Sequence, residues 1–255
     1  MDDRLWCICV KSFILSSQSI IKVRSMTPLH AYDTIIFDLD GTLLDTWPSL
    51  LRAVHYVTAP GATLDPAALR HMLSQGIDAM FALAARQSAH TGAQAREAQA
   101  DMARHYAART LLEARPYPGA ARLLEALVEA GYRLALCTNR DRASTLALLA
   151  RQDWLACFAQ VHCLDDGLPP KPDPAAPLAL LARLGCAPAQ AIFVGDSHVD
   201  AQCADRAGIA FAAHLGGYHA VPEDLDPAVF RYHDAHDLTQ WLARQPAATM
   251  ETAHE

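Results

Sequence analysis

The chain has 255 residues, of which 52% are hydrophobic and 19% charged, so it can bury a large core in one or two domains. Its net charge of −7 at pH 7 gives no electrostatic reason to expect nucleic acid or an anionic membrane surface as a partner. No apolar run reaches the roughly 18 residues of a membrane-spanning helix, and the seven cysteines include no CxxC pair. We therefore expect a cytoplasmic protein with reduced thiols and with neither membrane nor nucleic acid as partner.

The two ends of the chain differ from the rest. Residues 1–25 begin with acids, hold only short apolar pieces and lack the small-residue cleavage pattern of a secretory signal. We expect residues 1–31 to be an N-terminal extension that is not part of the fold, and residues 246–255 to be a tail.

From Tyr32 onward, strand and helix signals alternate along the chain. Apolar, β-branched runs predict buried parallel strands, which we place at residues 34–39, 133–138 and 191–196, with weaker candidates at 160–163 and 209–213. Helical patterns lie between these runs and end at glycines such as Gly131, Gly185 and Gly208. The alternation predicts an α/β fold with a doubly wound, mostly parallel, Rossmann-like sheet, whose ligand site lies at the carboxyl ends of the strands.

One long segment breaks the alternation. Residues 47–114 carry a helical pattern rich in Ala, Leu, Gln and Arg, interrupted by glycines and without a convincing strand. Prolines mark its edges at Pro48 and Pro116. We therefore expect an α-helical cap over residues 47–114, inserted into a catalytic core formed by residues 32–46 and 115–245.

The stretch FDLDGT places two carboxylates at the end of the first predicted strand. Because residues two apart face the same side of a strand, Asp38 and Asp40 are expected to project together. Two unpaired carboxylates about 4 Å apart repel by roughly 4 kcal/mol at an effective dielectric constant near 20, so the pair requires a cation or a retained proton. A calcium loop also contains D-x-D-G, but its further acidic positions are missing and the flanks read as strand.

The stretch GDSHVD ends another predicted strand. Asp196 lies at the strand terminus, where it could reach the same cation. Asp200 lies one turn into the following helix, where it could hold a water or the metal shell. Taken alone, this stretch has a second explanation, in which Ser197 simply caps the helix. Combined with Asp38 and Asp40, however, it builds an oxygen-rich site suited to Mg²⁺.

Two more loops follow predicted strands. In CTNR, Thr138 offers a hydroxyl, and the next amides are expected to open a helix at Arg140 and form an anion seat, although a plain helix cap explains the same residues. In PPKPDP, prolines stiffen the loop around Lys171, and Asp173 and Pro174 are expected to be the N-cap and the first residue of a helix. A lone loop lysine is more often solvated than functional, so only its position after a strand makes Lys171 a candidate.

Taken together, these residues resemble the four signature motifs of the haloacid dehalogenase-like hydrolase superfamily in order and spacing. The motifs are DLDGT at residues 38–42, Thr138, Lys171 and GDSHVD at residues 195–200. The helical insert is similar to the small α-helical cap of the branch that contains phosphoglycolate phosphatases and β-phosphoglucomutases. The stretch DTWPSL replaces the more usual acid-containing sequence of that branch.

The resemblance implies roles for four catalytic residues. Asp38 would be the nucleophile that forms an aspartyl-phosphate. Asp40 would protonate the leaving alcohol and later activate water. Thr138 and Lys171 would stabilise the phosphoryl oxygens in the transition state.

The resemblance also implies a Mg²⁺ cofactor and a set of binding residues. The metal ligands would be Asp38, the backbone carbonyl of Asp40, Asp196 and, in the surrounding shell, Asp200. The substrate-binding residues would be Gly41, Thr42, Asn139 and, from the cap segment LRHMLSQG, Arg70.

The acid at Asp40 favours phosphate transfer, because the haloacid dehalogenases of the superfamily need no protonated leaving group and lack this acid. We expect a magnesium-dependent phosphatase for a small phosphorylated metabolite of the phosphoglycolate kind, acting as a monomer or homodimer. A phosphosugar mutase of the β-phosphoglucomutase type is an open alternative, although those enzymes usually carry Val where this chain has Thr42. A non-catalytic phospholigand-binding module is another alternative, and it would predict loss of Asp38, Asp40 or Lys171.

Overall fold

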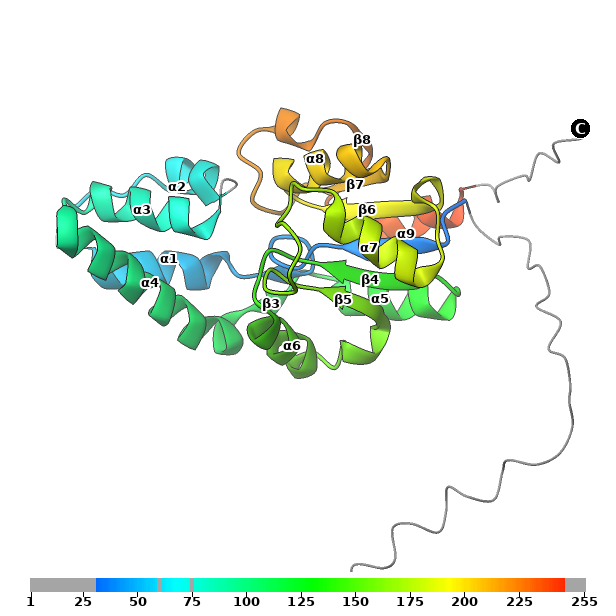
Figure 1. Ribbon diagram of the computed structural model, residues 1–255, viewed down its shortest axis with the longest axis horizontal. Coiled ribbons are helices and arrows are strands. Elements are labelled where there is room, and N and C mark those ends of the chain that lie inside the picture. The colour runs from blue at the N-terminus through cyan, green and yellow to red at the C-terminus, as the bar shows by residue number, and fades with distance from the viewer. Residues whose placement is uncertain (1–30, 59–60, 74–75, 246–255) are drawn as a thin grey trace, which may run out of the picture.

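The computed structural model describes residues 31–58, 61–73 and 76–245 (Figure 1). The tail predicted at residues 246–255, and the predicted N-terminal extension except its last residue, lie outside the described residues. Among the described helices, none combines the length and the apolar character needed to cross a bilayer.

A six-stranded parallel sheet forms the centre of the larger lobe, with the strands in the order β5-β4-β1-β6-β7-β8. The strands are β1 (Thr34–Phe37), β4 (Arg133–Cys137), β5 (Phe158–His162), β6 (Ala191–Gly195), β7 (Ala210–His214) and β8 (Ala228–Tyr232). This order confirms the predicted doubly wound, Rossmann-like α/β fold. Because β1 lies between β4 and β6, the loops that follow these three strands meet at one edge of the sheet.

Helices cover both faces of the sheet (Figure 1). One face carries α5 (Ala120–Glu129), α6 (Arg142–Arg151) and α9 (Ala235–Ala243), and the other carries α7 (Ala175–Leu184) and α8 (His198–Ala207). Successive residues of β1 point to opposite faces, so that Ile35 and Phe37 pack with the first set of helices and Ile36 with the second. Each such buried side chain contributes about 1.5–3 kcal/mol, and burial on both sides fixes the strand that leads to Asp38.

Residues 47–113, inserted between β1 and α5, form a smaller lobe, the cap (Figure 1). Its helices are α1 (Trp47–Val57), α2 (Pro66–Leu73), α3 (Ile77–Gln87) and α4 (Gly92–Glu113). They bury a core of their own that includes Met80, Phe81 and Met102. As predicted, the described part of residues 47–114 contains no strand.

Two short strands connect the cap to the larger lobe. They are β2 (Leu44–Asp45) and β3 (Arg115–Pro116), which pair antiparallel. The two linkers of the cap are therefore hydrogen-bonded to each other, and the first of them begins only four residues after Asp40.

The helix expected to open at Arg140 begins two residues later. The helix α6 starts at Arg142, because Asp141 is its N-cap and accepts a hydrogen bond of 2.9 Å from the backbone N–H of Ser144. The amides of residues 139 and 140 consequently belong to a loop, and the predicted anion seat at a helix start is wrong in this detail.

Other boundaries also differ from the sequence-based expectation. Pro174 is the N-cap of α7, one position later than predicted, although the carboxylate of Asp173 still accepts the N–H of Ala175 at 2.9 Å. The edge strand β8 was not predicted, because it is only partly buried and carries Arg231.

Candidate active site

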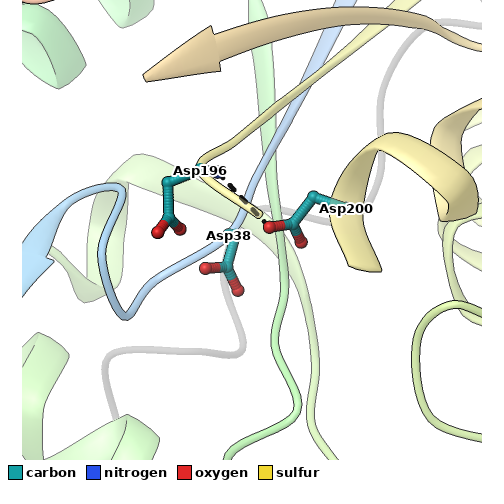
Figure 2. Close-up of side chains that lie close together, drawn as sticks. All are labelled: Asp38, Asp196 and Asp200. Carbon is teal, nitrogen blue, oxygen red and sulfur yellow. Dashed lines mark hydrogen bonds between the residues drawn. The ribbon is translucent and has the colours of Figure 1, made fainter. Parts of the chain in front are cut away.

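Three of the predicted acidic residues come together at the carboxyl edge of the sheet (Figure 2). Asp38 follows β1, Asp196 follows β6, and Asp200 lies in the first turn of α8. One carboxylate oxygen of each lies within 4.8 Å of the others, and all three side chains are buried. Three carboxylates in one buried site repel each other and lose their hydration, so they require positive charge nearby.

Lys171 provides part of that charge. Its Nζ donates hydrogen bonds of 2.6 Å to Oδ1 of Asp38 and 2.6 Å to Oδ1 of Asp200. The side chain of Asn139 fixes the lysine loop, since its Nδ2 donates to the carbonyl of Lys171 and its Oδ1 accepts the Lys171 N–H, each at 2.9 Å. Although burial opposes its charge, the carboxylates of Asp200 and Asp38 hold the pKa of Lys171 well above its ordinary value.

The remaining charge imbalance falls on Asp38 and Asp196. Burial raises the pKa of Asp38 to about 7, opposed by Lys171 and reinforced by Asp200. Burial, together with the nearby carboxylates of Asp200 and Asp38, raises the pKa of Asp196 well above its ordinary value. Within the described residues, Asp196 forms no ion pair with a cationic side chain. A buried carboxylate without a counter-charge, beside two other carboxylates, fits a divalent cation.

Asp200 serves the local backbone as well as the acidic cluster. Its Oδ2 accepts the N–H groups of Asp196 (3.3 Å) and Ser197 (3.2 Å) and the hydroxyl of Ser197 (2.6 Å). Ser197 is the N-cap of α8, so the capping interpretation of GDSHVD is confirmed, and the stretch also delivers both aspartates to the site. Because most of its acceptor capacity is already used, Asp200 is better suited to shaping the site than to direct metal ligation.

Gly41 and Thr42, predicted to bind substrate, lie against Asp196. Gly41 has a φ of +90°, and a Cβ at this position would lie 2.2 Å from Oδ2 of Asp196, so only glycine fits. The hydroxyl of Thr42 donates to Oδ1 of Asp196 at 3.0 Å. The Thr42 side chain therefore orients a metal-ligand candidate.

Asp40 has a different environment from the other three aspartates. Its carboxylate accepts a two-pronged interaction from Arg140, with Nε to Oδ2 at 2.9 Å and Nη2 to Oδ1 at 2.8 Å. The hydroxyl of Thr46 donates to Oδ1 at 2.8 Å. Although burial favours the neutral acid, Arg140 and the Thr46 hydroxyl outweigh it and hold the pKa of Asp40 below its ordinary value.

A further residue, Tyr218, links the acidic cluster to the start of the cap. Its backbone N–H donates to Oδ2 of Asp196 at 2.6 Å. Its phenol oxygen accepts the N–H groups of Thr46 at 2.6 Å and Trp47 at 2.9 Å. The Thr46 hydroxyl already donates to Asp40, so the single proton of the Tyr218 hydroxyl is donated either to Thr46 Oγ1, 3.1 Å away, or to Oδ1 of Asp45, 3.4 Å away.

The other predicted residues take positions around this centre. Thr138 is buried at the end of β4, and its Oγ1 accepts the N–H of Arg140 at 3.2 Å. The guanidinium of Arg70, on α2, lies 4.8 Å from the ring centroid of Trp47, which itself lies 6.0 Å from the ring of Tyr218. Arg70 is therefore placed at the aromatic start of the cap.

Sequence reasoning missed Arg140, Tyr106 and Tyr218. Arg140 directly follows Thr138 and Asn139 at a strand terminus, a position that could have drawn attention. Tyr218 follows two glycines just beyond β7, which is a comparable signal. Tyr106 lies in an alanine-rich stretch of α4, where only the i, i+4 spacing of its buried residues distinguishes it.

Comparison with known proteins assigns the family. The family model described as haloacid dehalogenase-like hydrolase matches residues 35–214. The chain belongs to the haloacid dehalogenase-like hydrolase family. Members of this family generally use Mg²⁺, which agrees with the acidic cluster.

Relatives within this family share a name. A phosphoglycolate phosphatase of Rhodospirillum rubrum is 36% identical over 218 residues, covering 82% of this chain and 90% of its own. A phosphoglycolate phosphatase of Agrobacterium fabrum is 34% identical over 212 residues, covering 81% and 88%. Among solved structures, a predicted phosphoglycolate phosphatase from Haemophilus somnus superposes with a TM-score of 0.74 at 25% identity, covering 84% of this chain and 99% of its own.

Proposed function

We propose that the protein is a cytoplasmic, magnesium-dependent phosphatase that hydrolyses phosphoglycolate or a closely similar phosphomonoester through an aspartyl-phosphate intermediate. The buried cluster of Asp38, Asp196 and Asp200, with Lys171 bonded to Asp38, carries this proposal. The names of the relatives support the substrate class.

In the first step, a carboxylate oxygen of Asp38 attacks the phosphorus atom of the substrate. The bond from phosphorus to the Asp38 oxygen forms as the bond to the leaving alcohol oxygen breaks, and Asp40 gives that oxygen its proton. In the second step, Asp40 takes a proton from a water molecule that attacks phosphorus. Inorganic phosphate is released and the Asp38 carboxylate is restored.

The surroundings of Asp40 suit the second step directly, since Arg140 and Thr46 favour the ionised form that acts as base. The first step requires Asp40 to hold a proton. The dianionic phosphate of the substrate promotes this, because negative charge beside a carboxylate raises its pKa. Proton uptake by Asp40 is therefore coupled to substrate binding.

A divalent cation would be held by Asp38, Asp196 and the backbone carbonyl of Asp40, with Asp200 nearby, and when bound it offsets the repulsion between the Asp38 carboxylate and the phosphate. Lys171 contacts Asp38 and Asp200 and would hold a phosphoryl oxygen beside the nucleophile. The hydroxyl of Thr138 and the amide of Asn139 lie in the neighbouring loop and would bind the other phosphoryl oxygens.

The test is phosphate release from a panel of phosphate esters that includes phosphoglycolate, with either Mg²⁺ or EDTA present. We expect release that depends on Mg²⁺, is fastest with phosphoglycolate and is abolished in Asp38→Asn. Asp33→Asn is the matched control, because Asp33 precedes the opposite end of the same strand and pairs with Arg133 at 4.0 Å. Interconversion of sugar phosphates without phosphate release would favour a mutase. Inactivity both in phosphate release and in sugar-phosphate interconversion would refute the proposal that the protein is an enzyme.

A further inference from the structure

Arg140 was not among the residues expected to form the site, yet its guanidinium is largely buried. Its side chain is 7% exposed, and it bonds through Nε and Nη2 to both carboxylate oxygens of Asp40. Nη2 also donates to the hydroxyl of Tyr106, which comes from the cap helix α4. Arg140 thus lies between the proposed acid–base residue and the cap.

The guanidinium has hydrogen-bonding capacity left. Of its five N–H groups, those on Nε and Nη2 serve Asp40 and Tyr106. Among the described residues, Nη1 makes one long contact of 3.4 Å with Oγ of Ser144. The edge of the guanidinium formed by Nη1 and Nη2 can therefore bind a second anion while Asp40 stays bonded. The anion would replace the Tyr106 hydroxyl as the partner of Nη2.

The reaction itself fixes where such an anion would lie. Asp40 must contact the leaving oxygen of the ester to protonate it. In phosphoglycolate, a single methylene group separates that oxygen from the carboxylate. The substrate carboxylate must therefore lie close to Asp40, and Arg140 is the cation bonded to Asp40.

We propose that Arg140 binds the carboxylate of the substrate and makes the enzyme selective for phosphate esters whose alcohol carries a negative charge close to the ester oxygen. This inference rests on the proposed function and names the residue that sets its specificity. Tyr106 closes the same subsite from the cap and exchanges its contact with Arg140 for the incoming carboxylate.

The balance of charges in the site also points to Arg140 as the group that binds the substrate carboxylate. The site contains four carboxylates, those of Asp38, Asp40, Asp196 and Asp200, and two cationic side chains, those of Lys171 and Arg140. A divalent cation therefore makes the site neutral when all four carboxylates are ionised. Lys171 is bonded on the nucleophile side, where the phosphate binds. Without Arg140, the substrate carboxylate would meet Asp40 as an uncompensated like charge.

The experiment compares kcat/KM for phosphoglycolate and for 2-hydroxyethyl phosphate, an ester of similar size in which a neutral hydroxymethyl group replaces the carboxylate. In Arg140→Met, we expect the ratio of the two values to fall about 10- to 100-fold, the range for loss of a charged hydrogen-bonding partner. The loss should be concentrated in KM for phosphoglycolate, because the interaction is made with the bound substrate as well as with the transition state.

Three further variants make the result specific. Arg140→Lys keeps the charge but not the two-pronged geometry and should give an intermediate ratio, which remains decisive if Arg140→Met does not fold. Arg142→Met is the matched control, because Arg142 lies two residues away in sequence and pairs with Asp166 outside the acidic cluster. Its ratio should equal that of the wild type. Arg70→Met tests the other arginine predicted to bind substrate.

The outcomes separate this inference from the proposed function. Equal losses for both esters in the Arg140 variants would overturn the inference and make Arg140 a positioning residue for Asp40 alone. A fall in the ratio in Arg70→Met with none in Arg140→Met would overturn it as well. A wild-type enzyme that hydrolyses both esters without preferring phosphoglycolate refutes the inference alone, whereas one that hydrolyses neither refutes the proposed function.

Discussion

Replacing Asp38 by asparagine should stabilise the metal-free protein while it abolishes activity. Burial and the carboxylate of Asp200, opposed by Lys171, raise the pKa of Asp38 from 3.8 to about 7. At about 1.36 kcal/mol per tenfold change in the acid dissociation constant, ionised Asp38 costs the fold about 4 kcal/mol. Asparagine removes this cost but also loses the charge on one of the two 2.6 Å bonds of Lys171, so we expect a net gain of about 1–3 kcal/mol at pH 8.

The sign of the pH dependence follows from the raised pKa. Between pH 3.8 and about 7, the folded protein keeps a proton on Asp38 that the unfolded chain has released. The native state therefore loses stability as the pH rises through this window, and the full cost applies above pH 7. The advantage of the variant over the wild type should shrink by about 2–3 kcal/mol between pH 8 and pH 5.

The assay is equilibrium unfolding in urea, followed by circular dichroism in EDTA at pH 5 and pH 8, with Asp33→Asn as control. Addition of Mg²⁺ should then stabilise the wild type more than Asp38→Asn, because a ligand that binds only the native state stabilises it by mass action. A variant less stable than the wild type in EDTA at pH 8, or a stability difference that does not change with pH, would refute this account of the buried acidic cluster.

Three other substitutions test the supports of the site. Tyr218→Phe removes the oxygen that accepts two amides at the start of α1, so the free energy of unfolding should fall by about 2–3 kcal/mol; an unchanged urea midpoint would contradict this. Gly41→Ala places a Cβ 2.2 Å from Oδ2 of Asp196 at a φ of +90°, and kcat should drop at least about 100-fold in phosphate-release assays, with full retention of activity as the contrary result. The Nδ1 of His214 lies 2.8 Å from the carbonyl oxygen of Gly41. Burial lowers the pKa of His214 from 6.5, so the unfolded chain takes up the proton first, and the contribution of His214 to stability should decline as the pH falls below about 6.5, opposite in sign to that of Asp38. His214→Asn should reduce this decline in urea unfolding at pH 5.5 and 7.5, and identical pH profiles would count against a neutral buried histidine.

The strands that matter most for the site were predictable from the sequence because they are buried on both faces. The strands β1 and β6 are continuous apolar runs with every residue buried, and no amphipathic alternation obscures them. The strand β8 lies at the sheet edge, with Val229 exposed and Arg231 only partly buried, so it lacks the continuous buried apolar run that identifies β1 and β6. The linker strands β2 and β3 have two residues each, too few for any periodicity.

The site was predictable where local rules apply. Asp38 and Asp196 directly follow buried strands, and such positions converge in a parallel sheet whatever the rest of the chain does. The cationic partner of Asp40 obeys no local rule: Arg140 lies 100 residues away in sequence, and Tyr106 contacts Arg140 from a helical position 34 residues before it. Such pairings depend on how the cap packs against the sheet, which neither periodicity nor turn chemistry encodes.

Those long-range contacts also connect the chemistry to the cap. Asp196 is joined through Tyr218 to the first amides of α1, and Asp40 is joined through Arg140 to α4. The first and the last helix of the cap are therefore each bonded to a side chain that contacts a proposed metal ligand or the proposed acid–base residue. A change of charge at either carboxylate alters the strength of these bonds. Metal binding at Asp196 and substrate binding at Asp40 are thus both expected to bear on the position of the cap.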